Sequence, residues 1–225
     1  MQRLALAPRT RVALVSGRPI GELRRFLDVP GIYYVGVHGA EVRCPTGELR
    51  IAHGTDRVRA ALPEIRRHLQ QTLGARRGIM IEDKGVALAC HYRLAAPIDA
   101  MTARRVAAAL AEEHRRRGIP IALVFGHEVA ELRPAHVNKG RTTCALLAAQ
   151  GAGVLPVYIG DDQTDEDAFA LLPPGTITIR VAPPNTMTRA CYQVREPSDV
   201  HRFLRHVLES RAAHIARPPA DAAAT

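Results

Sequence analysis

Acidic side chains gather in one short segment of the chain. Five carboxylates lie between residues 161 and 167, directly after the apolar run 157–159, in the sequence GDDQTDED (160–167). Carboxylates this close together repel one another unless a cation lies among them. Mg²⁺ takes hard oxygen ligands and keeps several of its waters, so it is the cation that this segment favours. The spacing therefore predicts a magnesium site at the end of a buried strand.

Part of this acidic segment has a simpler explanation. Thr164 with Asp167 three residues later resembles the pair of side chains that caps a helix, and acidic residues suit a helix N-terminus. This explains Thr164, Asp165 and Asp167 without a metal. It does not explain Asp161 and Asp162, which precede the expected helix. A calcium-binding EF-hand is excluded, because the segment lacks the glycine and the final glutamate of that loop.

A second polar segment, Ser16-Gly17-Arg18-Pro19, follows the apolar run that ends at Val15. A small hydroxyl and free backbone N–H groups at the start of a helix form an anion site that suits a phosphate group. Any turn from a strand into a helix favours serine and glycine, so the local structure alone also explains this segment.

Only two of the 31 lysines and arginines are lysines, Lys84 and Lys139. Where arginine has replaced nearly every lysine, we expect the remaining two at places that need a compact ammonium group. Lys139 opens an expected helix, where its charge opposes the helix dipole at a cost of roughly a few tenths of a kcal/mol or more. We therefore expect a compensating anion beside it, either a carboxylate cluster or a phosphate. Ser16, Lys139 and the carboxylates would then converge at one end of a parallel sheet as a phosphate–magnesium centre.

Short apolar runs alternate with helical patterns along the chain. Strands are expected at 11–15, 32–37, 41–43, 49–52, 78–83, 86–94, 121–125, 127–133, 154–159, 176–181 and 192–194. Helices are expected at 19–27, 55–73, 99–117, 139–150, 164–172 and 198–213, and residues 2–7 resemble the end of a further helix. The last residues, 214–225, are expected to form a disordered tail.

The two ends of the chain show strand–helix alternation, which is typical of a parallel α/β sheet. The middle, residues 48–134, has instead the pattern of hairpins and helices of an α+β insert. An insert that leaves a parallel core and returns to it favours a cap over an active site at the carboxyl ends of the strands. We therefore expect a core made of residues 1–47 and 135–213, with an inserted cap at 48–134.

The composition is that of an ordinary globular chain: 47% of the 225 residues are apolar and 24% are charged. No run approaches the length of a membrane helix, the N-terminal residues do not resemble a signal peptide, and the four cysteines form no CxxC pair. We therefore expect a cytoplasmic protein without a membrane partner. The net charge of +9 would suit a nucleic-acid binder, but the arginines lie on expected helices without aromatic residues among them, which favours a solvated surface.

Several motifs taken together resemble one family. The segments around Ser16, Lys139 and Asp161 match, in order and spacing, three motifs of the haloacid dehalogenase phosphatase superfamily. Over about residues 10–210 the chain resembles the trehalose-6-phosphate phosphatases, through VSGRP (15–19), GVHGAE (36–41), Lys84-Gly85, His91-Tyr92-Arg93, Glu131-Leu132-Arg133-Pro134 and GDDQTDEDAF (160–169). The resemblance implies an α/β fold: a Rossmann-like parallel-sheet core of haloacid dehalogenase type with an inserted α+β cap domain. It also implies hydrolysis of trehalose 6-phosphate to trehalose and phosphate with Mg²⁺ as cofactor.

The resemblance further implies roles for single residues. Ser16 and Lys139 would hold the phosphoryl group, and Asp161 would bind Mg²⁺ and serve catalysis, with Asp162 and Asp165 as further metal ligands. The residues expected to bind the substrate, the last four of them through glucose hydroxyls, are Arg18, Glu82, Lys84, Arg93 and Glu131.

The four cap residues are expected to be paired in sign, Glu82 with Lys84 and Arg93 with Glu131. Each residue taken alone is also explained by a surface ion pair. As a set facing one cleft, they favour recognition of a sugar.

The chain departs from the family at its start. The family opens with a strand carrying an Asp-x-Asp-Gly-Thr motif, whose first aspartate attacks the phosphorus, and this sequence has no such motif. Only 15 residues precede Ser16, and none of them is Asp or Glu. We therefore expect a chain shortened at its N-terminus, with a central strand and the nucleophile missing. The alternative is a non-catalytic relative that binds the sugar phosphate as a sensor or partner domain. The partner protein that the resemblance suggests is trehalose-6-phosphate synthase.

Overall fold

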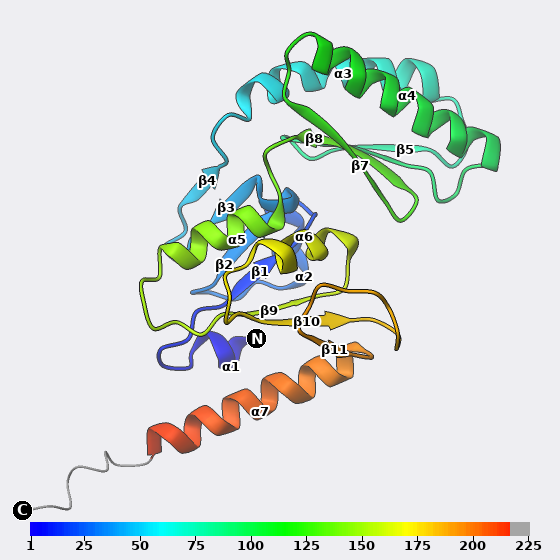
Figure 1. Ribbon diagram of the computed structural model, residues 1–225. Helices are drawn as coiled ribbons and strands as arrows, with labels where there is room; N and C mark the ends of the chain where they lie inside the picture. The colour runs from blue at the N-terminus through cyan, green and yellow to red at the C-terminus, as the bar shows by residue number, and fades with distance from the viewer. Residues whose placement is uncertain (217–225) are drawn as a thin grey trace, which may run out of the picture.

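Two groups of strands and helices make up the part of the chain that the structure describes. The computed structural model describes residues 1–216, and Figure 1 shows an upper group, in cyan and green, standing apart from the strands below it. We use the name α+β unit for the upper group, residues 56–134.

The α+β unit is a four-stranded antiparallel sheet with two long helices, α3 (Asp56–Leu73) and α4 (Pro97–Arg116), on the face turned away from the rest of the molecule (Figure 1). The order of its strands is β5 (Met80–Asp83), β6 (Leu88–His91), β8 (Val129–Pro134) and β7 (Ile121–Gly126). Ala103, Ala107 and Ala111 recur every four residues on one side of α4 and are fully buried. Their small side chains let α4 pack closely on the core of this unit.

Four strands from the N-terminal part form a second sheet, preceded by α1 (Gln2–Ala5). β1 (Ala13–Val15) leads through α2 (Ile20–Phe26) to the parallel β2 (Tyr33–Gly36), and a 3-10 turn (Val37–Gly39) then leads to β3 (Glu41–Arg43) and β4 (Leu49–Ile51). The insert was expected to begin at residue 48, but β4 pairs with β3 and so belongs to this sheet. The reason is the hairpin turn at Gly47, whose φ of +95° returns the chain alongside β3.

The C-terminal part forms a third sheet, of three parallel strands. Its elements are α5 (Lys139–Ala148), β9 (Val157–Gly160), α6 (Gln163–Leu171), β10 (Ile177–Val181), β11 (Tyr192–Val194) and α7 (Pro197–Ala216). Residues 214–216 are thus helical, where the start of a tail was expected. Residues 217–225 of that expected tail lie outside the described residues.

The expected parallel strands are present, but they are divided between two sheets instead of forming one. β1 pairs with β2 through Val12 O and Ser16 N, so its alternate residues, Ala13 and Val15, present their backbone groups to the other side. No strand within residues 1–216 pairs with that side, and β9 is likewise an edge strand. Val15 packs against the cluster around Tyr158 of β9, so the two sheets adjoin through side chains.

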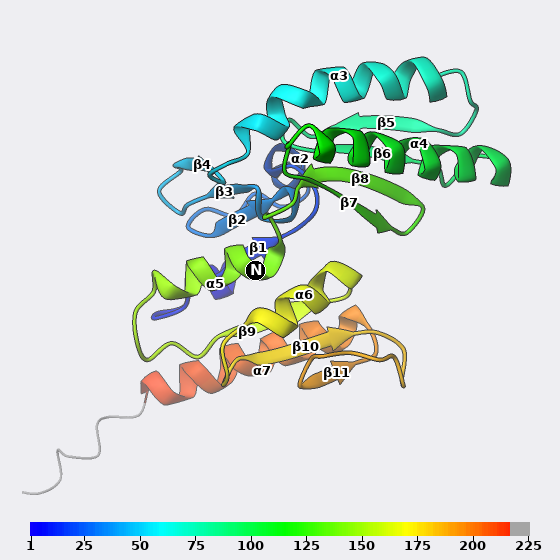
Figure 2. The same ribbon diagram turned by 45° about the horizontal axis from the view of Figure 1, so that its top comes forward.

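Three segments that carry polar side chains lie close to one another in this fold. Lys139, the first residue of α5, contacts Asp165 of α6, and Lys84 of the α+β unit contacts the backbone of Gly17 beyond β1. In Figure 2 the helices α5 and α6 lie next to each other beneath the α+β unit. Across residues 1–216, no helix has the length and apolar character needed to cross a membrane.

Candidate active site

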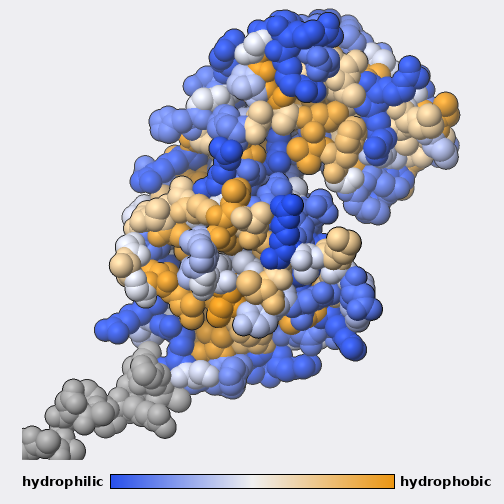
Figure 3. Space-filling view, in the orientation of Figure 1, coloured by the Kyte–Doolittle hydropathy of each residue, from blue (hydrophilic) through white to orange (hydrophobic). Residues whose placement is uncertain are grey.

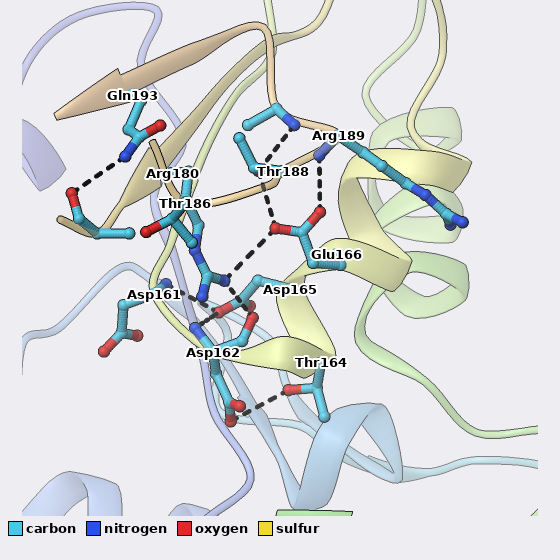
Figure 4. Close-up of polar contacts among 12 residues, drawn as sticks. Asp161, Asp162, Thr164, Asp165, Glu166, Arg180, Thr186, Thr188, Arg189 and Gln193 are labelled. Atoms are coloured by element: carbon cyan, nitrogen blue, oxygen red, sulfur yellow. Dashed lines mark hydrogen bonds and ion pairs between the residues drawn. The ribbon is translucent and has the colours of Figure 1, made fainter. Parts of the chain in front are cut away.

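The acidic segment forms the turn between β9 and α6 (Figure 4). Asp162 is the N-cap of α6, with φ −100° and ψ 159°, and its backbone N–H donates to the carboxylate of Asp165 at 2.9 Å. The expected capping pair, Thr164 with Asp167, is therefore wrong. Asp162 takes this position because it precedes the helix directly, and Thr164 donates its hydroxyl to Asp162 at 3.3 Å.

The carboxylate of Asp165 is buried and accepts four hydrogen bonds. One oxygen accepts from Lys139 Nζ at 3.0 Å and from the Tyr158 hydroxyl at 2.8 Å. The other accepts the backbone N–H groups of Asp161 at 3.1 Å and Asp162 at 2.9 Å. Asp165 thus organises the turn and has no oxygen left without a partner.

Two neighbours of Asp165 have properties that follow from this close packing. A methyl group at Gly160 would lie 2.4 Å from Asp165 Cγ, so only glycine fits there. Burial raises the pKa of Tyr158, and the charge of Asp165 raises it further. Tyr158 is therefore held as a protonated hydrogen-bond donor.

Lys139 lies at the first position of α5, where 5% of its surface is exposed. Its N-cap, Asn138, accepts the backbone N–H of Arg141 at 2.8 Å. The expectation of an anion beside Lys139 is confirmed, because Asp165 supplies it at 3.0 Å. An ammonium group has three N–H donors, of which this contact uses one.

Asp161 is exposed, and its carboxylate points away from the network around Asp165 (Figure 4). Among residues 1–212, the part with described side chains, its side chain makes no hydrogen bond or ion pair, and no three His, Cys, Asp or Glu side chains gather as a metal cluster. Of the three expected metal ligands, the structure commits Asp165 to protein donors and leaves Asp161 and Asp162 exposed at the turn.

A buried ion pair that the sequence analysis missed supports this turn from the other side (Figure 4). Arg180 of β10 donates to the carbonyl oxygen of Asp162 at 2.6 Å and lies 3.6 Å from the carboxylate of Glu166. Glu166 in turn accepts the Thr188 hydroxyl and the Arg189 N–H, each at 2.8 Å. The signal was an arginine in the apolar strand Ile177–Val181, next to Gly160 on β9.

Ser16 follows β1 directly and lies in a turn held by its own backbone. Its N–H donates to Val35 at 2.9 Å, its carbonyl accepts from His38 at 3.0 Å, and its hydroxyl accepts the N–H of Arg18 at 3.2 Å. The hydroxyl therefore lies at the strand end, as the sequence predicts.

The other groups around the start of α2 already have partners. The N–H of Ile20 donates to Glu41 at 3.0 Å. The guanidinium of Arg18 pairs with Glu22 at 3.4 Å and lies over the ring of Phe26. Arg18, expected to bind the substrate, is thus directed along the surface of α2.

The contact between the α+β unit and the rest of the molecule combines an apolar cluster with a polar one. We call the polar one the interface cluster: Gly17, His38, Lys84 and Glu131. Lys84 Nζ donates to Glu131 Oε2 at 2.9 Å and to the Gly17 carbonyl at 3.0 Å. His38 Nε2 lies 3.3 Å from the same carboxylate oxygen. The side chains of Lys84 and Glu131 are only 8% and 7% exposed.

Glu131 is ionised in this cluster. Burial raises its pKa, but His38 and Lys84 lower it by more, and the result is a pKa of about 2. Its second oxygen, Oε1, has no hydrogen-bond partner within the described residues. The carboxylate is therefore charged and only half satisfied.

The expected pairs Glu82 with Lys84 and Arg93 with Glu131 are wrong. Glu82 instead lies 2.8 Å from His91, and Arg93 pairs with Glu128 at 3.2 Å near the surface. The chain brings Lys84 and Glu131 together because Glu131 lies opposite Ala89 on β6, close to the turn that carries Lys84.

His38 and Gly17 were missed as parts of the site. His38 has φ 56° and ψ 22°, a left-handed conformation, and a methyl group at Gly17 would lie 2.5 Å from its Nε2. The position of the His38 ring therefore requires a glycine at residue 17. The signal was the histidine in GVHGAE (36–41), which has no other evident role.

Figure 3 shows the molecular surface hollowed between the α+β unit and the lower part, with both hydrophilic and hydrophobic residues around the hollow. The interface cluster and the acidic turn come from these two parts. Their side chains are anionic, cationic and hydroxyl groups, which suit a polar, charged ligand better than an apolar one.

Comparison with known proteins identifies the family. The trehalose-phosphatase family model matches residues 1–205. A trehalose-phosphate phosphatase of Mycobacterium tuberculosis (strain H37Rv) is 34% identical over 209 residues, 88% of this chain and 51% of that protein. One of Mycobacterium avium (strain 104) is 39% identical over 172 residues, 73% of this chain and 42% of that protein. The chain spans about half the length of the curated relatives it matches.

The fold agrees with these matches. The solved C-terminal domain of trehalose-6-phosphate phosphatase from C. albicans superposes with a TM-score of 0.78 at 21% identity, over 93% of this chain and 82% of that one. The expected α/β class with a parallel sheet is thereby confirmed. Because the family model matches nearly the whole chain, the chain belongs to the trehalose-phosphatase family.

Proposed function

We propose that this protein hydrolyses trehalose 6-phosphate to trehalose and inorganic phosphate, as a phosphoric monoester hydrolase of trehalose biosynthesis. Family membership and the name of its relatives, trehalose-phosphate phosphatase, support the proposal. One observation carries it: the carboxylate of Asp165 binds the buried ammonium group of Lys139 and also the backbone of the acidic turn, while the carboxylate of Asp161 in the same turn stays exposed.

Mg²⁺ fits the donors at this turn. Asp161 and Asp162 offer carboxylate oxygens, and Mg²⁺ needs only one or two carboxylates when waters and a phosphate complete its shell. We assign Asp161 and Asp162 as the residues that would hold it, with Asp165 fixing their backbone. When bound, Mg²⁺ would neutralise negative charge on the phosphoryl oxygens.

Ser16 and Lys139 are the groups proposed to hold the phosphoryl group. Lys139 keeps two N–H donors beyond its contact with Asp165, and an ammonium group is suited to a phosphate oxygen as a point charge. Attack on the phosphorus is assigned to no residue of this chain, because the sequence holds no Asp-x-Asp-Gly-Thr motif.

The α+β unit is proposed to act as a cap that recognises the sugar. Leu132 packs into the core beneath α3 and α4, so Glu131, next to it on β8, lies on the opposite face of the sheet, together with Glu82. Glu82, Lys84, Arg93 and Glu131 remain the candidates for the glucose hydroxyls. The cap would comprise the α+β unit, residues 56–134, because β4 belongs to the lower sheet.

We place this activity in the cytoplasm, with trehalose-6-phosphate synthase as the partner that supplies the substrate. The four cysteines, Cys44, Cys90, Cys144 and Cys191, are free thiols, which suits a reducing compartment.

The test is phosphate release from trehalose 6-phosphate with Mg²⁺ or with EDTA. The protein is made both as the 225-residue chain and from coding DNA that includes the in-frame codons upstream of Met1. Magnesium-dependent release at about 1 s⁻¹ or faster from either protein, with glucose 6-phosphate cleaved far more slowly, is the expected result. Equal rates on both sugars, or no release from either protein, would overturn the proposal.

A further inference from the structure

Buried polar atoms without a hydrogen-bond partner are uncommon in folded proteins, and here they concentrate in one place. Within residues 1–212, whose side chains the structure describes, there are six such side-chain atoms, and four of them belong to the interface between the α+β unit and the rest. They are Nε and Nη1 of Arg133, Oε1 of Glu131 and Nδ1 of His38. Arg133 lacks the most hydrogen bonds of the three residues, because two of these atoms belong to it, and it also carries a full charge.

Arg133 lies on the face of the sheet that is turned toward the lower part of the molecule. Leu132, its neighbour, is fully buried in the core beneath α3 and α4, and side chains alternate along a strand. Arg133 therefore shares the opposite face with Glu131. It is closer to the end of β8 than Glu131, and β8 leads directly to Lys139 at the start of α5.

The charges around Arg133 are carboxylates that do not bond to it. Burial lowers its pKa, while the charges of Glu131 and Asp167 act in the opposite direction. Neither carboxylate forms an ion pair with Arg133, which is only 6% exposed. The backbone of Asp167 in turn abuts Gly140, the residue after Lys139, since a methyl group there would lie 2.8 Å from the Asp167 carbonyl. The carboxylate whose charge acts on Arg133 therefore belongs to the part of α6 that packs on the start of α5.

We infer that Arg133 is a further substrate-binding residue, which donates from its guanidinium group to an oxygen of the phosphoryl group. This inference rests on the proposed function, in which Lys139 holds the same phosphoryl group. A buried guanidinium without an acceptor is costly, and a phosphate oxygen supplies both the acceptor and the opposite charge. A sugar hydroxyl would supply only the acceptor.

The position also gives Arg133 a distinct task. Glu131 lies two residues before it on the same face, in the candidate sugar region, and Lys139 lies beyond the end of the strand. A guanidinium between these two regions would bind the phosphoryl group from the side of the cap. Substrate would then be held by both parts of the molecule, and the cap would sense the charge of the phosphate as well as the sugar.

The test is calorimetric titration of the full chain, in the presence of Mg²⁺, with three ligands: trehalose 6-phosphate, inorganic phosphate and trehalose. The variants are Arg133→Gln, which removes the charge, and Arg133→Lys, which keeps it but not the planar donor group. Asp167→Asn is the matched control, because Asp167 is the exposed carboxylate that would be the internal partner of Arg133. The melting temperature of each variant is recorded.

We expect Arg133→Gln to weaken binding of inorganic phosphate and of trehalose 6-phosphate by about tenfold or more, because a charged hydrogen bond is lost. Trehalose should bind to it as to the wild type, Arg133→Lys should lose less, and Asp167→Asn should keep wild-type affinities. If Arg133→Gln does not fold, Arg133→Lys provides the test: it should bind phosphate more weakly than the wild type and trehalose equally well.

Other outcomes overturn the inference. Unchanged phosphate affinity in both Arg133 variants would leave Arg133 a purely structural residue, as would equal losses of melting temperature in Arg133→Gln and Asp167→Asn without a change in affinity. If the Arg133 variants lost affinity for trehalose as much as for phosphate, Arg133 would bind sugar hydroxyls and not specifically the phosphoryl group. If the wild type binds phosphate but not trehalose 6-phosphate, the proposed function fails while the phosphate titrations still decide the role of Arg133. If the wild type binds no phosphate, both fail.

Discussion

The two lysines of the chain are both buried beside a carboxylate, and they hold together different parts of the molecule. Lys139 and Asp165 join α5 to α6 on one side of the site, at 3.0 Å. Lys84 and Glu131 belong to the α+β unit, and Lys84 reaches across to the Gly17 carbonyl in the lower part, also at 3.0 Å. The first pair is internal to the C-terminal part, whereas the second spans an interface.

The two carboxylates also differ in how completely they are bonded. Asp165 accepts four hydrogen bonds, whereas Glu131 has one oxygen without any partner within the described residues. A buried network in which every polar atom is hydrogen-bonded makes a region rigid. A network with an unpaired buried atom is stabilised when a ligand or a water molecule bonds to that atom. The comparison therefore indicates that the acidic turn is fixed before substrate arrives, and that the interface is completed by what binds there.

The largest effect should come from breaking the internal pair. Lys139→Met leaves Asp165 buried without its cation, and the free energy of unfolding should fall by about 3–5 kcal/mol. Lys84→Met should cost less, about 1–2 kcal/mol, because His38 remains beside Glu131 and the interface can admit water. Guanidinium unfolding curves of the two variants measure the difference. Equal losses would contradict the distinction between a fixed pair and an interface pair.

Acid should weaken the interface in a defined pH range. The pKa of Glu131 is about 2 in the fold and 4.5 ordinarily, so its contribution to stability is complete above pH 4.5 and is lost as the pH falls toward 2. The shift corresponds to about 3 kcal/mol. Stability measured from pH 6 to pH 2 should fall in that range, and Glu131→Gln should lack this part of the loss. An unchanged acid profile in Glu131→Gln would show that Glu131 does not contribute it.

Removing the exposed carboxylate of the fixed turn should affect the metal and not the fold. Asp161→Asn should weaken Mg²⁺ binding on the order of 100-fold, or ~2.7 kcal/mol, with an unchanged melting temperature, because the Asp161 side chain has no partner in the described residues. Asp167→Asn, which changes an exposed carboxylate on α6, is the matched control and should keep wild-type affinity. Calorimetric titration with Mg²⁺ measures both, and similar losses in the two variants would move the metal away from Asp161.

The sequence alone predicted most helices and strands, and it predicted the side of the site formed by the acidic turn and Lys139. Apolar runs and helix starts located the strands that end at Val15 and Gly160, and the charge of Lys139 at a helix start predicted an anion beside it. These are local signals, in which the residues that explain each other are close in sequence or share one sheet end.

The remaining features depend on long-range pairing, which a single sequence does not encode locally. The pairing of β4 with β3 and the division of parallel strands over two sheets follow from strand contacts. The pairing of Lys84 with Glu131 instead of Glu82 follows from how β5, β6 and β8 align. Arg180 was missed for the same reason, because its partners Asp162 and Glu166 lie on other elements.

The smallest effect on stability should come from Arg93, which pairs with Glu128 at the surface of the α+β unit. Replacing Arg93 decides whether it binds the sugar or only forms a surface ion pair. Arg93 and Glu128 have side chains 65% and 45% exposed, so Arg93→Ala should change the free energy of unfolding by less than about 1 kcal/mol. If Arg93 binds a glucose hydroxyl, the variant should still bind trehalose and trehalose 6-phosphate about fivefold more weakly, because a donor to the sugar is lost. Inorganic phosphate, which has no sugar, should bind as in the wild type. This pattern is the reverse of the one expected for Arg133, so calorimetric titrations of the two variants check each other.

Unchanged affinity for all three ligands would leave Arg93 as a surface ion pair, and the recognition of the sugar would then rest on the buried residues Lys84 and Glu131.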